Sequence, residues 1–416
     1  MRAVLVLLFV SASPILAAES SEPLHLDVIV EAGDYTRTDT PVSLELKHLT
    51  KPASKLQLLE HRNGKTVPIP FQIERGPKPR IWWIVSGLLP KNVLRYYELK
   101  QRTSASRSDN PVVKTEKNET GLKISIQGKP VLNYNAAHVK PPAGVDAKYG
   151  RSAHIHPIWT PGGQVVTDEH PTDHYHQSGL YLAYTKTEFE GRHPNFWDLL
   201  KGGARVRYAE TLSTTSGPVF GGFSVRNEHV DQSLPGGNEK VALNENWNVR
   251  FFNVGGPKKG YWLGEIVSTR ECASSSPLNI LKYHYGGMAI RGARGWSKEH
   301  GSFLTSEGKT RIEGNHTRPV WVDMAGGKND QWSGVTVFTH PKNFRFPEPV
   351  RLHPSMPYFV WTPAVLGPWS IEPGEKHVSR YTYLIHDGKP NPELANRIWN
   401  DIQHPPLVSS KPVSKK

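Results

Sequence analysis

Cysteine is almost absent from the chain, which has a single one, Cys272, among 416 residues. A disulfide within the chain needs two cysteines and a thiolate metal cluster needs several, so the sequence excludes both. A nucleophilic role for Cys272 is the alternative to a buried structural thiol, which we favour. Because exported proteins without disulfides are more typical of the bacterial periplasm than of eukaryotic secretion, this shortage favours the periplasm if the chain is exported.

Long apolar runs are also missing, apart from one short run at the N-terminus. Arg2 precedes the apolar residues 3–10, and Ala17-Ala18 offers a cleavage site of small residues, so we predict a signal peptide over residues 1–18. No later stretch is long and apolar enough for a membrane helix. We therefore expect a soluble, exported protein without a membrane span, in the bacterial periplasm or outside the cell.

Several motifs of known chemistry are absent. The sequence has no GxSxG elbow, no GxGxxG or phosphate loop, and no HExxH zinc motif. It also has no helix-turn-helix, zinc-finger or RNA-binding signature, so we expect no nucleic-acid partner. The formal net charge of +13 is spread along the chain. It favours anionic partners such as acidic polysaccharides, and its simpler interpretation is a solubilising surface.

Glycine, proline and large aromatic side chains are abundant, with 36 Gly, 35 Pro, 12 Trp and 15 Tyr. Many short stretches alternate apolar and polar residues, and together these features predict an all-β protein with many turns. Residues 41–47 are a clear example of the strand period. Asn63-Gly64 stands between two such stretches and predicts a hairpin.

The order of these patterns predicts the domain organisation. A polar segment that is low in aromatic residues separates two strand-rich regions and is typical of a linker. Near the C-terminus, Pro392 stands early in a segment where Leu394, Ile398 and Trp399 share one face, which predicts a helix. We expect a small β-sandwich domain at 24–100, a linker at 101–120, a large antiparallel β-sandwich at 121–390, a helix at 391–403 and a disordered tail at 404–416.

Residues 151–184 form the stretch with the most reactive side chains. His154 and His156 lie two residues apart, as do His174 and His176, so each pair would share one face of a strand. A Pro-Gly-Gly turn between the pairs would let them converge. The other polar members are His170, Asp168, Glu169 and Asp173.

Three interpretations of this cluster are open. As metal ligands, the two histidine pairs suit zinc, iron or copper. As acid–base groups, His174 or His176 would accept a proton near neutral pH, with Asp173 as the orienting carboxylate. As structural groups, the imidazoles would form hydrogen bonds beneath loops. We expect no cofactor, and a divalent or transition metal held by His154, His156, His174 and His176 is the alternative.

Later segments offer partners for the cluster. Arginines near histidines suit a substrate with a carboxylate, such as a uronic acid, and tryptophans such as Trp197 could stack on sugar rings, although most are expected in the core. Asp198 and nearby glutamates could supply paired carboxylates, but nothing fixes the separation that glycoside hydrolysis needs. The predicted catalytic residues are His174, His176, Asp173 and His340, and the predicted substrate-binding residues are His154, His156, His170, His284, Arg291, Asn343 and Arg345.

Several blocks of the sequence resemble the domain of unknown function 6807 family, also labelled "methane oxygenase PmoA". The blocks span residues 121–387: they are His156-Pro157 with Thr160-Pro161-Gly162-Gly163, Val166-Thr167-Asp168, Asp173 to Leu180, Phe196-Trp197, Tyr285 to Arg291, Trp321-Val322-Asp323, residues 334–341 with Asn343, and His386-Asp387-Gly388. The chain departs from the family pattern at Tyr175 and at Gln177-Ser178, where members carry His-Arg.

This resemblance implies an exported protein of polysaccharide-degrading bacteria, while the family label implies an oxidoreductase. The pattern His-x-His-x-x-Gly is in addition similar to a motif of aldose epimerases, which fold as a large antiparallel super-sandwich and act on a pyranose with a histidine acid and a glutamate base. We therefore expect a carbohydrate-active hydrolase, lyase or epimerase that acts on a polysaccharide fragment. The alternatives are a metal-dependent oxidoreductase with histidine ligands and a glycan-binding protein without activity.

Overall fold

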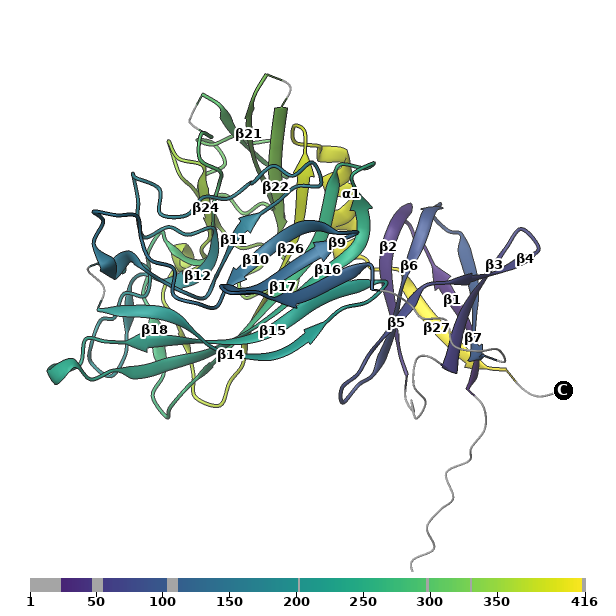
Figure 1. Cartoon of the computed structure of the whole chain (residues 1–416), viewed down its shortest axis with the longest axis horizontal. Helices are drawn as coiled ribbons and strands as arrows, with labels where there is room; N and C mark the ends of the chain where they lie inside the picture. Colours follow the sequence, from purple (N-terminus) through teal and green to yellow (C-terminus); the bar gives the residue numbers. More distant parts are fainter. Residues whose placement is uncertain are drawn as a thin grey trace, which may run out of the picture.

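The computed structural model of the chain describes residues 24–46, 55–102, 111–200, 203–296, 299–329 and 331–413. It is an all-β protein with one short C-terminal helix, as predicted. A large part made of two eight-stranded sheets meets a small part at one end (Figure 1). The signal peptide predicted for residues 1–18 lies outside the described residues. No helix among the described residues is both long and apolar enough to cross a membrane.

The small part consists of a five-stranded and a three-stranded antiparallel sheet packed around one core. That core holds Val28, Trp83, Tyr97 and Leu99, all of which are buried. The five-stranded sheet has the order β27 (Leu407–Pro412), β1 (His25–Glu31), β7 (Leu94–Gln101), β3 (Leu56–Arg62) and β4 (Lys65–Ile69), and the three-stranded sheet has the order β2 (Arg37–Glu45), β6 (Arg80–Leu89) and β5 (Phe71–Glu74).

The hairpin predicted at Asn63-Gly64 is confirmed. It joins β3 to β4, and both turn residues have positive φ angles, 50° for Asn63 and 71° for Gly64. Asn and Gly tolerate the left-handed region that a two-residue turn between strands requires. The local pattern was sufficient here because the turn depends on the two residues alone.

The C-terminal tail was predicted as disordered, and this prediction is wrong for residues 407–412. They form β27, which pairs antiparallel with β1 and places Val408 opposite Val30 (Figure 1). The edge of β1 carries backbone groups that need hydrogen-bond partners, and any extended chain can supply them. The polar composition of the tail therefore did not decide its structure. Residues 414–416 lie outside the described residues.

The linker predicted at 101–120 also needs correction. Gln101 ends β7, and Val113–Lys117 form β8, the edge strand of the large first sheet, with Val113 fully buried. β8 pairs with β9 because Asn118, Thr120 and Gly121 form a tight turn between them. A single apolar residue in a polar edge strand gives a weak periodic signal. Residues 103–110 lie outside the described residues.

The large part is a sandwich of two sheets with the main hydrophobic core between them. The first sheet has the order β23 (Val350–Leu352), β24 (Tyr358–Trp361), β19 (Gly286–Arg291), β12 (Leu180–Tyr184), β11 (His154–Ile158), β10 (Lys129–Asn135), β9 (Gly121–Ile126) and β8 (Val113–Lys117). The second has the order β14 (Ala204–Thr215), β15 (Phe220–Asp231), β16 (Lys240–Gly256), β17 (Tyr261–Cys272), β26 (His377–Asp387), β22 (Gln331–Phe338), β21 (Trp321–Lys328) and β20 (Gly301–Thr305).

Smaller elements complete the large part. A three-stranded sheet is formed by β13 (Thr187–Glu188), β18 (Leu278–Ile280) and β25 (Trp369–Ile371), and short 3-10 turns lie at Ala147–Tyr149, Pro235–Gly237 and Pro363–Leu366. The predicted helix is confirmed as α1 (Pro392–Gln403), whose N-cap Asn391 accepts a hydrogen bond from the backbone N–H of Leu394. Ile398 and Trp399 of α1 are buried in a cluster with Leu384 of β26.

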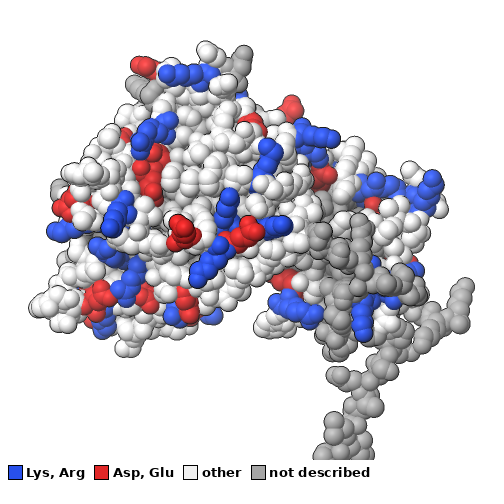
Figure 2. Space-filling model, in the orientation of Figure 1, with Lys and Arg blue, Asp and Glu red and all other residues white. Residues whose placement is uncertain are grey.

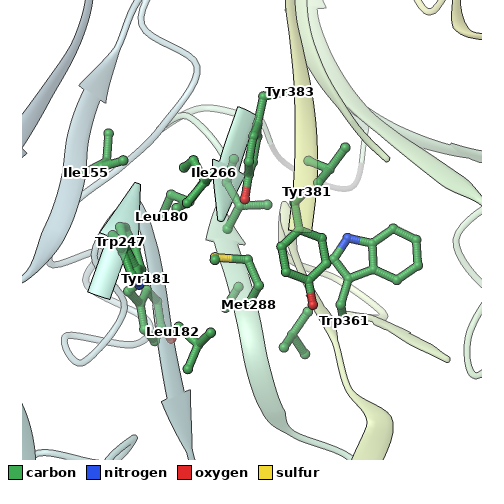
Figure 3. Packing of buried hydrophobic residues seen from close by; sticks show 14 of the residues in the cluster. Ile155, Leu180, Tyr181, Leu182, Trp247, Ile266, Met288, Trp361, Tyr381 and Tyr383 are labelled. Atoms are coloured by element: carbon green, nitrogen blue, oxygen red, sulfur yellow. The ribbon is translucent and has the colours of Figure 1, made fainter. Parts of the chain in front are cut away.

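Strand alternation gives the first sheet two different faces. Its inward face is apolar: Leu180 and Met288 pack close to Ile266 and Tyr381 of the second sheet (Figure 3). The registers of β10, β11, β12, β19 and β24 place their intervening residues on the outward face. These are Asn135, His154, Tyr181, Arg291 and Tyr358. A row of polar and aromatic side chains therefore crosses the outward face of one sheet.

Candidate active site

A cavity of about 280 Å³ lies by the outward face of the first sheet, and we call it the histidine cavity. Four segments reach it together with β24: the turns before β12, the residues after β12, the segment around Trp197, and the loop that leads into β19. It is lined by His174, His176, Gln177, Thr185, Lys186, Asn195, Trp197, Asp198, Tyr283, Tyr285 and Tyr358.

His174 and His176 lie together in this cavity, as their spacing predicts, but they lie in turns and not on a strand. Their ring centroids are 5.5 Å apart, and the ring of His353 lies 6.1 Å from that of His174. The turns are closed by backbone hydrogen bonds, among them Gln177 N–H to His174 O at 2.9 Å. The cavity therefore has two imidazoles in its lining, and a third, that of His353, lies beside His174 and had no signal in the sequence.

Arg291 fixes these turns from the outward face of β19. Its guanidinium donates to Gln177 Oε1 at 2.9 Å and to Asp173 Oδ2 at 3.1 Å, and its side chain is 7% exposed. The carboxylate of Asp173 thus lies beside Arg291, and no hydrogen bond joins it to an imidazole within the described part of the chain. The roles predicted for Asp173 and Arg291, orienting a base and binding substrate, give way to anchoring the histidine turns.

The imidazoles and phenols of the cavity differ in their protonation. Burial lowers the pKa of His176 to about 4, with the charges of His174 and Arg151 adding to this effect and Asp198 opposing it. Burial and the guanidinium of Arg351 lower the pKa of His353 to about 4. Burial raises the pKa of Tyr358 well above its usual value. Near pH 7 the cavity therefore has a neutral imidazole, that of His176, which accepts a proton, and a phenol, that of Tyr358, which donates one.

Aromatic rings form much of the cavity wall. The ring centroids of Trp197 and Tyr285 are 5.6 Å apart, and the Nζ of Lys186 lies 4.7 Å from the ring centroid of Tyr283. His284, predicted to bind substrate, packs against Tyr283 and Tyr285 at 4.2 and 4.6 Å and does not itself line the cavity. Aromatic faces together with a cation suit a sugar that carries a negative charge.

Arg151 lies at the base of this arrangement, and the sequence analysis gave it no role. It is 1% exposed, its guanidinium lies 4.4 Å from the ring centroid of Tyr181, and Nη1 donates to His176 O at 3.4 Å. Burial lowers its pKa. Arg151 thus supports the backbone of His176 through this hydrogen bond. No spacing pattern in the sequence indicates that contact.

His156 of the other histidine pair lines a second cavity, of about 360 Å³, that borders β9, β10 and β11, and the fully buried His154 lies behind its wall, against Asn135 and Glu169. We call it the asparagine cavity because it is lined by Asn118, Asn133 and Asn135, together with Lys123, His156, Trp159 and Glu169 among others. The amide of Asn118 donates to Asn133 Oδ1 at 2.6 Å, and that of Asn133 donates to Asn135 Oδ1 at 2.9 Å. A fixed ladder of amides therefore forms this wall.

His154 and His156 are bound to their neighbours at this second cavity. The Nε2 atom of His154 contacts Glu169 and lies 3.1 Å from Asn135 Nδ2, and His156 Nδ1 lies 2.9 Å from Thr167 Oγ1. Burial lowers the pKa of His156 to about 4. Burial also lowers the pKa of His170, whose Nε2 lies 3.0 Å from Tyr149 O.

The four histidines considered as metal ligands are thus divided between two cavities. Among the described residues, no three His, Cys, Asp or Glu side chains come together in a metal-binding arrangement. The lone Cys272 is half-buried, its Sγ lies 3.0 Å from Ile371 O, and burial raises its pKa. This environment is that of a structural thiol, as the sequence analysis favoured.

His340, Asn343 and Arg345 lie outside both cavities. Asn343 donates to Glu348 Oε2 at 2.7 Å and to Arg380 O at 2.9 Å, and Arg345 donates to three backbone carbonyls, those of Pro363, Gly367 and Pro368. Asn343 and Arg345 therefore tie loops to the sandwich. Burial, followed by the charge of Arg380, lowers the pKa of His340 to about 4. Their closeness in sequence reflects a loop, and the catalytic and binding roles predicted for them need correction.

Three comparisons with known proteins complete the description. Residues 121–400, which are 280 of the 416 residues, match the family model "Family of unknown function (DUF6807)". No curated protein matches the chain.

Solved structures with related folds are distant. A protein in the glycosyl hydrolase family 38 from Enterococcus faecalis shows 11% identity and a TM-score of 0.42, covering 94% of this chain and 47% of its own. The heparan sulfate lyase HepC from Pedobacter heparinus shows 10% identity and a TM-score of 0.32, covering 69% of this chain and 38% of its own. The chain spans less than half the length of either, and neither similarity is high enough to assign an activity.

Proposed function

The chain belongs to this family of unknown function, and we propose that it is a carbohydrate-active enzyme that transfers a proton on an acidic sugar in the histidine cavity. One observation carries the proposal: a neutral imidazole, His176, and a protonated phenol, Tyr358, line the same aromatic-walled cavity. A base and an acid that keep complementary protonation states near neutral pH are what general acid–base catalysis requires.

The size and lining of the cavity support a sugar unit as its occupant. Its volume of about 280 Å³ is close to the lower end of ligand pockets, which span roughly 300–1,000 Å³. Trp197 and Tyr285 offer faces for a sugar ring, and Lys186 offers a cation for a carboxylate. A uronic acid unit combines both features.

The proposed reaction begins with removal of a proton from the carbon that bears the carboxylate. His176 accepts the proton, and the electron pair of the C–H bond moves toward the carboxylate, where Lys186 stabilises the added charge. In a lyase, the neighbouring glycosidic oxygen then leaves with a proton from Tyr358. In an epimerase, a proton returns to the same carbon from the opposite face. Either outcome needs one base, one acid and one cation.

A glycoside hydrolase with paired carboxylates fits the cavity less well. Asp198 is the one carboxylate among the described residues that line it, and that mechanism needs two. The proposal requires no metal. We also propose that the protein works outside the cytoplasm, as the signal-peptide pattern in residues 1–18 suggests.

The test is activity on uronate-containing oligosaccharides, followed by the ultraviolet absorbance of unsaturated products and by proton NMR for epimers. We expect His176→Ala to lose activity by about 10²–10⁴-fold, the usual contribution of a general base. His340→Ala is the matched control, because it removes a half-buried imidazole outside the cavity, and it should retain activity. Full activity in a folded His176→Ala variant would contradict the proposal, and binding without any product would favour a glycan-binding protein.

A further inference from the structure

A larger hollow lies on the opposite side of the sandwich from both cavities. It has a volume of about 920 Å³ and lies where the small part meets the outward face of the second sheet. Its walls come from β5 and β6 on one side and from β14, β15, β16, β17 and β26 on the other. We call it the sheet groove.

The floor of the groove includes a cross-strand row of four side chains, three of them polar. Strand register aligns Ser224 of β15, Asn248 of β16, Val267 of β17 and Arg380 of β26. Asn248 and Arg380 are exposed, and Ser224 is half-buried. Hydroxyl, amide and guanidinium groups from three of the four strands lie along this line, with Val267 between them on β17, so an extended chain that lies across the sheet can meet a polar group on β15, β16 and β26.

Side chains of the small part and the large part contact each other along one wall of the groove. The guanidinium of Arg250 lies between aromatic rings, 4.6 Å from the centroid of Trp82 and 4.4 Å from that of Phe220. It is paired with Glu74 and Glu265, and Trp82 Nε1 donates to Glu74 Oε2 at 2.7 Å. Both carboxylates of the groove are therefore already engaged by Arg250.

Two further arginines of the groove have no such partner. Among the described residues, no carboxylate forms an ion pair with Arg75 or Arg380, and both are exposed. Lys and Arg elsewhere on the visible surface are scattered among acidic residues (Figure 2). Arg75 and Arg380 therefore complement negative charge on a ligand that lies in the groove.

We propose that the sheet groove is a second binding site, for a polysaccharide chain that carries anionic groups. Its volume exceeds what a single sugar needs, its floor offers partners for hydroxyl groups, and Arg75 and Arg380 recognise carboxylates or sulfate esters along the chain. The site lies on the second sheet and shares no lining residue with the histidine cavity. It keeps a polymer bound to the protein independently of the reaction.

The experiment measures the affinity of the full chain, by titration calorimetry and affinity electrophoresis, for three polymers: polygalacturonate, dextran sulfate and neutral dextran. The first two separate carboxylate from sulfate recognition. We expect binding to at least one anionic polymer and a loss of tenfold or more in the double variant Arg75→Gln/Arg380→Gln. The matched control Lys258→Gln/Lys328→Gln removes the same charge from exposed positions outside the groove and should change affinity less than twofold.

Independence from the histidine cavity is tested with His176→Ala, which should bind the polymers like the parent protein even if it has lost activity. Equal losses in the groove and control variants would show general attraction by a basic protein and overturn the proposal. Unchanged affinity in Arg75→Gln/Arg380→Gln, or an absence of binding to both anionic polymers, would overturn it as well. A thermal midpoint equal to that of the parent shows that the groove variant is folded.

Discussion

The reactivity proposed for this protein depends on the surroundings of one residue, His176. Its half-buried imidazole lies in a turn that Arg291 and Arg151 fix through hydrogen bonds to Gln177 and to the backbone of His176. Burial and these nearby charges disfavour its protonated form, so it acts as a base and not as an acid near pH 7. Replacing Arg291 or Arg151 by a neutral residue would remove hydrogen bonds that fix the turn. The same change would raise the pKa of His176, because a nearby positive charge is lost.

This environment predicts the pH dependence of catalysis. The pKa of His176 is depressed to about 4, so its basic form is present above that pH. We expect kcat/KM to stay constant from neutral pH down to about pH 5 and to fall as the pH drops through about 4, whereas an ordinary imidazole would lose activity below roughly pH 6.5. Circular dichroism at each pH separates titration from unfolding. An acidic limb near pH 6.5 in folded protein would show that His176 is not the base.

A second residue-scale prediction concerns the core of the sandwich. Glu245 is fully buried and accepts hydrogen bonds from Trp247 Nε1 at 2.7 Å and from Ser268, and its Oε2 lies 3.0 Å from His229 Nε2. Burial alone would raise its pKa, but His229 and the charge of Arg270 outweigh burial and leave it below the usual value. A depressed carboxyl pKa contributes stability above the unfolded-state value, about 4.5, and loses it as pH falls through the folded-state value.

Glu245→Gln should therefore lower the free energy of unfolding at pH 7 by about 3–5 kcal/mol, the usual effect of removing one partner of a buried pair. The difference from the parent should shrink below about pH 4.5. Urea denaturation at several pH values measures both. Glu210→Gln is the control, because its ion pair with Arg226 is exposed and worth less than about 1 kcal/mol. A loss that is independent of pH would mean that packing, and not charge, dominates at Glu245.

At the scale of elements, β27 shows how backbone pairing overrides composition. Six residues of a polar tail complete the edge of the sheet beside β1, with Val408 packed against the small core. Removing residues 407–416 should lower the midpoint of thermal unfolding by roughly 4–8 °C, which corresponds to about 2 kcal/mol in a large domain. A chain that ends at Val413 keeps β27 and should match the parent. Equal midpoints for all three proteins would show that the pairing adds nothing to stability.

Local sequence patterns predicted elements well where the structure depends on neighbouring residues. The Asn63-Gly64 turn and the helix capped by Asn391 are of this kind. They failed where an element depends on a distant edge, as β27 does on β1. They also failed for β8, because an edge strand with one buried valine has little periodicity.

At the scale of the whole molecule, the sequence predicted one wall of the candidate site and not the others. His174 and His176 lie together because only one residue separates them along the chain. Tyr358 joins them because β24 pairs with β19, which lies beside β12 in the first sheet. Lys186 joins them because it comes just after β12 in the sequence. Sequence spacing cannot report which strands become neighbours. The same limit explains why His340 and Asn343 were predicted as site residues. A loop that is anchored away from the cavity can have the same residue types at the same spacing as a loop that lines it.

The two faces of the molecule have separate roles in this account. The outward face of the first sheet carries the histidine cavity and the asparagine cavity, and the outward face of the second sheet carries the sheet groove. A polymer held in the groove would leave the first sheet free for a chain end or a fragment. The basic net charge of the chain would favour the approach of acidic polysaccharides to both faces.

The most direct test follows the proton itself. An acidic oligosaccharide labelled with deuterium at the carbon that bears the carboxylate is incubated with the parent protein, His176→Ala and His340→Ala, and deuterium in the solvent water is measured. The account predicts release by the parent and by His340→Ala at similar rates, and a loss of about 10²–10⁴-fold in His176→Ala. Product formed while the label stays on carbon, or release by His176→Ala at the rate of the parent, would contradict it.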